Sequence, residues 1–526
     1  MKKLKLPPGR GKKGNIVTGS STTRLKEWYA ANHYLAAGAG MIGIILLAVV
    51  VPVAIYRSIA ATGSTSFEPE NGSTTALAVV TTDSTASGGK YIQFTAASGG
   101  GGFAWPKSVS ANKRYLLDQN GQPYLVNGDA PHTIAYFRTV SEADQYFANR
   151  QGYGVNSAWV EIICDQYISC SNDRGPTVEG YSPFTGTDLS QPNPQFFTKL
   201  DQIVQSAQSH GITLFLTPVE TGGWTNNLIA NGTTKAFNYG VFLGNRYKNF
   251  PNIVWQHGND YSVNADTQMM AIFDGIKSVD TNHLQVLELY PPISATLDQS
   301  QWSSRVPVNE SYTYYATYNE NLHAYNQTPT MPMLMVEAGY EFENAGGRPS
   351  INTPNTLRRQ EYWTMTTGAT GQLYGSAYTW NETNWTTEQA NLDSPGIKQL
   401  QFMYDFFKVL PWYDLVPDQT HTFVTAGYGT YDSTQGGNVV NTSNYATAAR
   451  TADGKVGVVY TPVAHTLTVD MTKMNGQTTA QWFDGSNNTY QTVSGSPFAN
   501  TGTHQFTTPG NNSEGTGDWV LLLKSP

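Results

Sequence analysis

Two acidic residues each end an apolar run and could act together on a substrate. Asp260 ends the segment 252–260, Asn-Ile-Val-Trp-Gln-His-Gly-Asn-Asp, and Glu337 ends the segment 332–337, Pro-Met-Leu-Met-Val-Glu. In a parallel α/β barrel, polar residues that follow the strands lie at the mouth, where active sites form. Two carboxylates there suit the cleavage of a glycosidic bond, because one protonates the leaving oxygen while the other attacks or stabilises the anomeric carbon.

Other roles for these residues stay open at this stage. Asp260 could instead cap the helix that follows it, and Glu337 could form a salt bridge with an arginine such as Arg358. A metal-dependent hydrolase could use His257 together with Asp260 and Glu337, although no His-Glu-x-x-His cluster supports a metal site. A catalytically silent glycan-binding or adhesive protein is the other alternative. We expect no metal and no cofactor.

Further polar and aromatic residues lie near predicted strand ends and could bind sugar. Aromatic rings can stack on sugar faces, and carboxylates and imidazoles can bind hydroxyl groups. The predicted substrate-binding residues are Asp129, Glu220, Trp224, His257, Tyr340 and Trp380, and Trp385 is a further stacking candidate. Core or barrel-floor positions are the alternative for the Trp residues, Asp129 and His257. For Glu161, a solvated loop carboxylate is the more natural interpretation.

The elements that would position these residues alternate between strand and helix. Predicted strands lie near residues 125, 157, 214, 254, 286, 312, 335 and 375, with helical periodicity between most of them, and one helix is expected over 141–150 with Ser141 as its N-cap. About eight strands over roughly 300 residues predict an α/β fold, a (β/α)8 TIM barrel. A doubly wound open sheet is the competing architecture, but no Gly-x-Gly-x-x-Gly or P-loop motif follows any strand.

Five motifs in this region resemble the apiosidase-like glycoside hydrolases, a group related to glycoside hydrolase family 140. They run in order from residue 116 to 418 and comprise Gly128-Asp129-Ala130, the segments 255–260 and 336–341, the segment 368–375, and the segment 410–418. The resemblance implies a TIM barrel, Asp260 as general acid/base, and Glu337 as nucleophile of a retaining mechanism. Asn259 stands where that family often has glycine, and His132 where tryptophan is frequent, which puts the identity of the sugar in doubt more than the reaction.

The chain is predicted to have five parts. They are a basic tail (1–33), a transmembrane helix (34–56), a Ser/Thr/Gly-rich spacer (57–108), the catalytic barrel (109–416) and a β-sandwich (417–526). Within the spacer, 67–72 and 84–94 look like the opening strands of a carbohydrate-binding module, although a plain linker fits them better. The last part resembles the sandwich that often follows these barrels and is labelled as collagen-binding; we expect it to brace the barrel or bind glycan.

The N-terminal region carries the pattern of a membrane anchor. Residues 1–33 contain eight Lys or Arg and one acidic residue, and the next 23 residues are uncharged. Such a stretch spans a hydrocarbon core of roughly 30 Å, and the positive-inside rule keeps the basic tail in the cytoplasm. We therefore expect a single-pass type II protein in the cell membrane, with the bulk of the chain extracytoplasmic. A cleaved signal peptide is the alternative, but no good Ala-x-Ala site follows Arg57.

Composition and cysteine content narrow the possible partners. The net charge is −8 and only 13% of the residues are charged, so we expect no nucleic-acid binding, and the partners are a glycan substrate and the membrane. Protein partners cannot be inferred. Cys164 and Cys170 are the only cysteines, and outside the membrane a disulfide between them is favoured over two free thiols.

Overall fold

The structure is a computed structural model that describes residues 78–82, 90–94, 102–172, 175–344, 351–436 and 439–526. The chain divides into two compact units, residues 1–102 and 103–526. In the first unit, β1 (Ala78–Thr82) pairs antiparallel with β2 (Lys90–Phe94). The predicted membrane helix (34–56) lies outside the described residues. Among the residues that are described, no helix combines the length and apolarity needed to cross a bilayer.

The second unit begins with a TIM-barrel-like sheet of nine strands. Eight of them are parallel: β6 (Val126–Asp129), β7 (Ser157–Glu161), β8 (Thr213–Thr217), β9 (Ile253–His257), β10 (Gln285–Leu287), β12 (Asn309–Thr313), β13 (Met333–Glu337) and β14 (Ala369–Tyr374). They follow chain order, and β14 pairs with β6, as the last and first strands of a barrel do. The ninth strand, β11 (Ile293–Ala295), pairs antiparallel with β12 at the sheet edge.

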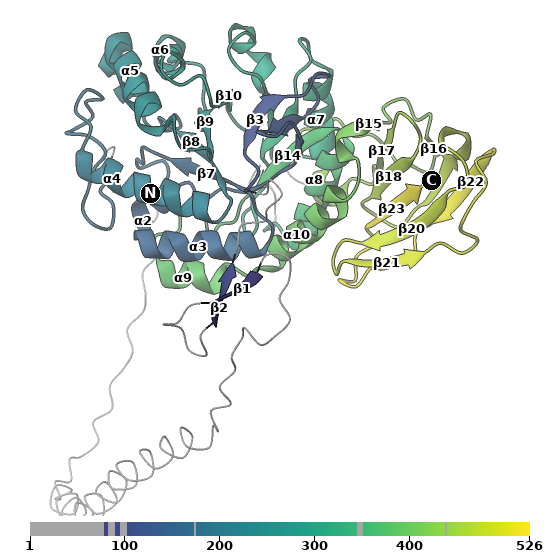
Figure 1. Cartoon of the computed structure of the whole chain (residues 1–526). Helices are drawn as coiled ribbons and strands as arrows, with labels where there is room; N and C mark the ends of the chain where they lie inside the picture. The colour runs from purple at the N-terminus through teal and green to yellow at the C-terminus, as the bar shows by residue number, and fades with distance from the viewer. Residues whose placement is uncertain (1–77, 83–89, 95–101, 173–174, 345–350, 437–438) are drawn as a thin grey trace, which may run out of the picture. The chain divides into compact units, whose positions relative to one another are not determined.

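Helices follow most of these strands and cover the outside of the sheet (Figure 1). They are α2 (Ile134–Phe137), α3 (Val140–Gly152), α4 (Pro194–Ser209), α5 (Thr225–Tyr247), α6 (Asp266–Lys277), α7 (Thr317–Asn326), α8 (Pro354–Thr366), α9 (Trp385–Asn391) and α10 (Pro395–Lys408). The predicted cap of the first long helix is wrong by two residues. Thr139 caps α3, because its side chain accepts from the Glu142 amide while the Glu142 carboxylate accepts from the Thr139 amide, a complete capping box.

Alternation along the strands separates an inner core from an outer one. Trp159, Phe215 and Val254 belong to an inner cluster, whereas their neighbours Val160 and Leu214 pack with the helices. The N-terminal end of the sheet carries a small antiparallel sheet of β3 (Pro106–Val109), β4 (Leu116–Asp118) and β5 (Pro123–Tyr124). Its apolar residues join the inner cluster. The opposite end, where the carboxyl ends of the strands meet, is left for loops.

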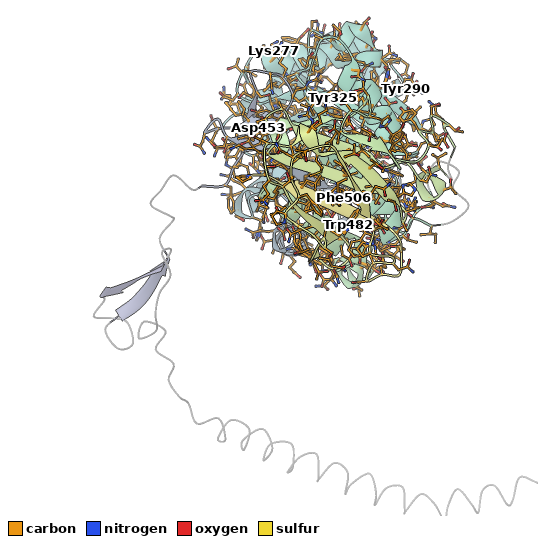
Figure 2. All side chains as sticks on the ribbon, turned by 90° about the vertical axis from the view of Figure 1, so that its right-hand side faces the viewer. Lys277, Tyr290, Tyr325, Asp453, Trp482 and Phe506 are labelled. Carbon is orange, nitrogen blue, oxygen red and sulfur yellow. A yellow bond between two sulfur atoms is a disulfide. The ribbon has the colours of Figure 1, made fainter. Side chains whose placement is uncertain are left out.

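Two packed sheets form the C-terminal domain. The larger has the order β15 (Leu415–Pro417), β17 (Thr447–Thr451), β18 (Val456–Thr461), β23 (Trp519–Lys524), β20 (Thr479–Asp484), β21 (Thr489–Thr492), and the smaller has β16 (Val424–Ala426), β19 (Thr466–Asp470), β22 (Thr503–Thr507). A short helix, α11 (Val439–Thr442), precedes β17. Figure 2 views this domain from its free side, with Trp482 and Phe506 over the strands. Both residues are buried in the core that joins the two sheets.

The C-terminal domain packs against the barrel through α8. One hydrophobic cluster contains Tyr362 and Trp363 of α8 together with Tyr460 of β18, and the Trp363 indole donates to the Tyr445 carbonyl at 3.0 Å. Beside this cluster, fully buried Arg358 donates two hydrogen bonds of 2.9 Å to the Asp518 carboxylate. The boundary predicted between residues 416 and 417 falls inside β15, which already pairs with β17.

Candidate active site

Asp260 lies on a turn directly after β9, the fourth parallel strand. Gly258 adopts a φ of 78°, and a Cβ there would come within 2.2 Å of the Glu288 carbonyl, so this turn requires glycine. Asp260 itself has a left-handed φ of 53°, which costs a non-glycine residue of order 1 kcal/mol and is typical of functional turns. Its amide donates to Glu288 Oε2 at 2.9 Å, and the Tyr167 hydroxyl donates to its carboxylate.

Glu337 is the last residue of β13, the seventh parallel strand. Its two oxygens each accept a hydrogen bond from a tyrosine, Oε1 from Tyr314 at 2.6 Å and Oε2 from Tyr340 at 2.8 Å. Tyr312 donates in turn to the Tyr314 hydroxyl at 2.5 Å. Hydroxyl donors on both oxygens hold the carboxylate in one orientation and stabilise its ionised form.

Both carboxylates open into one pocket of about 120 Å³. Its lining consists of His132, Tyr167, Ile168, Asn259, Asp260, Tyr314, Glu337, Tyr340, Glu343 and Trp380. Of the residues predicted to bind substrate, Tyr340 and Trp380 therefore reach this pocket. Tyr167, Tyr314 and Glu343 were not predicted, because nothing local in the sequence distinguishes them from other loop residues.

Burial and mutual repulsion govern the ionisation of this site. Burial and the charge of Asp260 together raise the pKa of Glu337 to about 8, although the tyrosine hydrogen bonds oppose this rise. Burial also raises the pKa of Asp260, while hydrogen bonds from Tyr167 and Tyr312 lower it. Behind them, burial and the charges of Glu337 and Asp260 raise the pKa of Glu288 well above its usual value. Buried carboxyl groups that repel one another cannot all ionise. The pair of Asp260 and Glu337 therefore keeps a proton near neutral pH.

A second buried network supports the pocket wall. Asn259 donates to Glu161 Oε1 at 3.1 Å, and His132 Nδ1 lies 3.6 Å from the same oxygen. The other nitrogen of His132 lies 3.1 Å from the Tyr340 hydroxyl. Burial lowers the pKa of His132 to about 3, so its ring is neutral. Glu161 is thus buried, and it is not the solvated loop residue that we expected. Asn259 and His132, the two positions that depart from the resembled family, both contact its carboxylate.

The other four residues predicted to bind sugar are buried and make their contacts with other residues of the protein. The Asp129 carboxylate accepts from Tyr146 and from buried Arg150, both at 2.5 Å, so it neutralises that arginine instead of facing the pocket. Trp224 is 1% exposed and belongs to the core between sheet and helices. His257 Nε2 lies 2.9 Å from Gln285 Oε1. Glu220 is buried and accepts from the Gly223 amide at 3.0 Å. None of the four lines the pocket.

The structure also bears on the other roles considered for the predicted residues. Because His257 packs against Phe273 with ring centroids 5.0 Å apart, it does not join Asp260 and Glu337 as a ligand set. Arg358 pairs with Asp518 and Glu514, so Glu337 is not its salt-bridge partner. Cys164 and Cys170 form a disulfide, which closes the loop that carries Tyr167 to Asp260. Trp385 packs near Arg138, with the guanidinium 5.5 Å from its ring.

Comparison with known proteins agrees with this fold and identifies the family. Residues 110–414, more than half of the chain, match the family model "Apiosidase-like, catalytic domain", and residues 433–524 match "Putative collagen-binding domain of a collagenase". A search of curated proteins finds no match to this chain. Among solved structures, one described as a glycoside hydrolase is 19% identical, with a TM-score of 0.69, and the match covers 80% of this chain and 97% of that one.

A second solved structure gives the same result for the fold. It is a glycoside hydrolase family 5 protein from Bacteroides vulgatus, 19% identical, with a TM-score of 0.68, and the match covers 80% of this chain and 93% of that one. Identities this low support the shared fold, while the family model and the two carboxylates at the strand ends support the chemistry. The chain therefore belongs to the apiosidase-like family, and it is a glycoside hydrolase.

Proposed function

We propose that this protein is a membrane-anchored, extracytoplasmic enzyme that cleaves O-glycosidic bonds of an oligosaccharide or polysaccharide by a retaining, two-carboxylate mechanism. One observation carries the proposal: a single pocket contains Asp260 after the fourth parallel strand and Glu337 at the end of the seventh, and the two charges influence each other. The relation to glycoside hydrolase family 140 stays a prediction.

The two carboxyl groups have different tasks in this proposal, although the pKa of each is raised. We assign the negative charge to Glu337, the nucleophile, because two tyrosine hydroxyls donate to its oxygens and stabilise the anion. The proton that the coupled pair keeps near neutral pH then lies on Asp260, which passes it to the leaving oxygen and later deprotonates the attacking water. Trp380 and Tyr340 supply aromatic walls against which a sugar ring can pack.

Retention of configuration is proposed from the resemblance to the apiosidase-like family. Retaining enzymes have carboxyl groups about 5–5.5 Å apart and inverting enzymes roughly 6.5–9.5 Å. The pocket, of about 120 Å³, is smaller than the roughly 300–1,000 Å³ of common ligand sites, which favours a single terminal sugar at its base.

The acid role of Asp260 predicts a dependence on the leaving group. In Asp260→Asn, we expect kcat/KM to fall about 10²- to 10⁴-fold on a natural glycan but little on a dinitrophenyl glycoside, whose leaving group departs without a proton. Because the pKa of Asp260 is raised, the parent enzyme should keep activity below that pKa and lose it as pH rises through it. On the activated substrate, the rate of Asp260→Asn should not show this fall at high pH. Initial rates over pH 4–10 measure both effects.

A panel of aryl glycosides and of plant and microbial glycans first identifies a substrate for residues 103–526. The matched control is Asp266→Asn, which removes a nearby carboxylate that bonds Tyr261 at 2.6 Å outside the pocket. Equal losses of Asp260→Asn on activated and natural substrates would refute the acid role. Glycan binding without any cleavage would instead favour a silent glycan-binding protein.

The anchor rests on the basic tail and on the uncharged stretch at 34–56. We expect the full chain to sediment with membranes and to resist extraction by carbonate, whereas a chain that starts at residue 58 should stay soluble. External protease should reach the catalytic unit in intact cells, as type II orientation requires. Release of the full chain by carbonate, or protection of the catalytic unit in intact cells, would argue against this topology.

A further inference from the structure

A cluster of metal-ligating side chains lies away from the active-site pocket, between a short 3₁₀ helix, η3 (Thr296–Asp298), and α7. Asp298 of η3 and Glu320 and His323 of α7 bring one ligand atom each within 4.8 Å of one another. The two α7 residues are three positions apart and so lie on one face of the helix. No residue of this cluster lines the pocket that contains Asp260 and Glu337.

Glu320 is the unusual member of this cluster. Its side chain is 95% buried, and its Oε1 has no hydrogen-bond partner. In the described part of the chain, neither Glu320 nor Asp298 forms an ion pair with a lysine or arginine, and His323 is the only cationic group that pairs with Asp298. A buried carboxylate without a partner is unfavourable by several kcal/mol unless it is protonated or meets a cation.

The other two members are held in position for a shared ligand. His323 Nε2 lies 2.8 Å from Asp298 Oδ1, and the Ala295 amide donates to Asp298 Oδ2 at 2.8 Å. Gln327, one turn further along α7, donates to Asp298 Oδ1 at 2.7 Å. These contacts orient the aspartate toward the helix face that carries Glu320 and His323. A cleft of about 540 Å³, lined in part by His323 and Gln327, opens beside the cluster and gives a cation access and room for water ligands.

We propose that Asp298, Glu320 and His323 bind one divalent transition-metal cation, with Zn²⁺ the best match. Two carboxylates and a neutral imidazole carry a charge of −2, which a divalent cation balances. The imidazole favours zinc-like ions, whereas Ca²⁺ takes six to eight oxygen ligands and Mg²⁺ keeps most of its waters. Water in the adjacent cleft would complete the coordination. This proposal is independent of the catalytic function proposed above.

The location suggests what the cation does. The parallel strands flanking this region are β10 and β12, and β11 intervenes as an antiparallel strand at the sheet edge. η3 follows β11 directly, and its Thr296 donates to the Leu287 carbonyl of β10 at 2.7 Å. A cation that joins η3 to α7 would therefore clamp the segment that bridges β10 and β12. We expect it to stabilise the barrel without contacting substrate.

The test uses the untagged full chain after removal of metals with EDTA and titration with ZnCl₂. We expect one Zn²⁺ per chain and a thermal midpoint that rises by several degrees at saturation, because a ligand of the folded state alone stabilises it. Glu320→Gln, which keeps the shape of the side chain, and His323→Ala should each weaken binding at least about tenfold. Both variants should keep the parent activity when measured without Zn²⁺.

His210→Ala is the matched control, because His210 forms a similar histidine–aspartate pair with Asp144 at 3.0 Å on the barrel surface. It should bind Zn²⁺ as the parent does. No Zn²⁺ binding by the parent, or equal binding by Glu320→Gln and His210→Ala, would overturn the proposal. Binding of Ca²⁺ but not Zn²⁺ would overturn the choice of metal. If circular dichroism shows that His323→Ala is not folded, the result for Glu320→Gln decides the outcome.

Discussion

Replacing Glu337 with glutamine is expected to lower kcat by at least about 10⁴-fold, the order of loss seen when the nucleophile of a covalent mechanism is removed. The amide cannot form the glycosyl-enzyme ester, and it also disturbs the hydrogen bonds that Tyr314 and Tyr340 donate to the carboxylate oxygens. Folding should survive, because glutamine has nearly the same shape. Rates of product release by the parent and the variant on an activated aryl glycoside measure the effect.

The matched control is Glu343→Gln, the same exchange at another pocket residue. Glu343 accepts a hydrogen bond from the Trp380 indole, so this change should affect sugar binding and raise KM more than it lowers kcat. Azide separates the two catalytic roles, because a retaining enzyme without its acid/base residue yields a glycosyl azide of retained configuration, and one without its nucleophile yields the inverted product. An active Glu337→Gln variant, or the same azide product from both variants, would contradict the assignment.

Breaking the buried contact between the barrel and the C-terminal domain should have the largest effect on stability. Arg358 of α8 is fully buried and donates to Asp518, to Gln399 at 2.6 Å and to Thr516 at 2.9 Å. In Arg358→Ala, the Asp518 carboxylate stays buried without its cation, which should cost about 3–5 kcal/mol. Denaturant or thermal unfolding of residues 103–526, followed by circular dichroism, measures the loss.

Two comparisons make this prediction specific. Arg246→Ala breaks a partly exposed ion pair with Asp201 and should cost no more than about 1 kcal/mol. The double variant Arg358→Met, Asp518→Leu removes both charges and should recover part of the stability lost in Arg358→Ala. Equal losses for Arg358→Ala and Arg246→Ala would show that the buried pair contributes no more than a surface one.

The buried pair of Arg358 and Asp518 should also make the stability of the folded protein depend on pH. Burial alone would raise the pKa of Asp518, but Arg358 outweighs it and lowers this pKa below its usual value. A group whose pKa is lower in the folded state stabilises that state above its unfolded pKa of about 3.9. This contribution is lost as pH falls through the folded pKa.

Strand ends and their carboxylates could be predicted because they depend on local pattern. Apolar runs of strand length end at Asp260 and Glu337, and all parallel strands of a barrel point their carboxyl ends toward the same face. The same reasoning also selected Asp129, Trp224 and His257, which follow or end strands equally well. Their partners, Arg150 of α3 for Asp129 and Gln285 of β10 for His257, lie 21 and 28 residues away, and only tertiary contacts reveal them.

The sequence by itself determined the alternating α/β architecture, the β-rich C-terminal region and the two acidic strand ends, because periodicity, turn residues and composition are local properties. Only the tertiary structure decided which side chains share the pocket. It brought Tyr167 and Tyr314 to Asp260 and Glu337 from loops far along the chain, and it gave Arg358 to Asp518 instead of Glu337. These choices depend on which groups burial brings within hydrogen-bonding distance, and burial is a property of the whole packed fold.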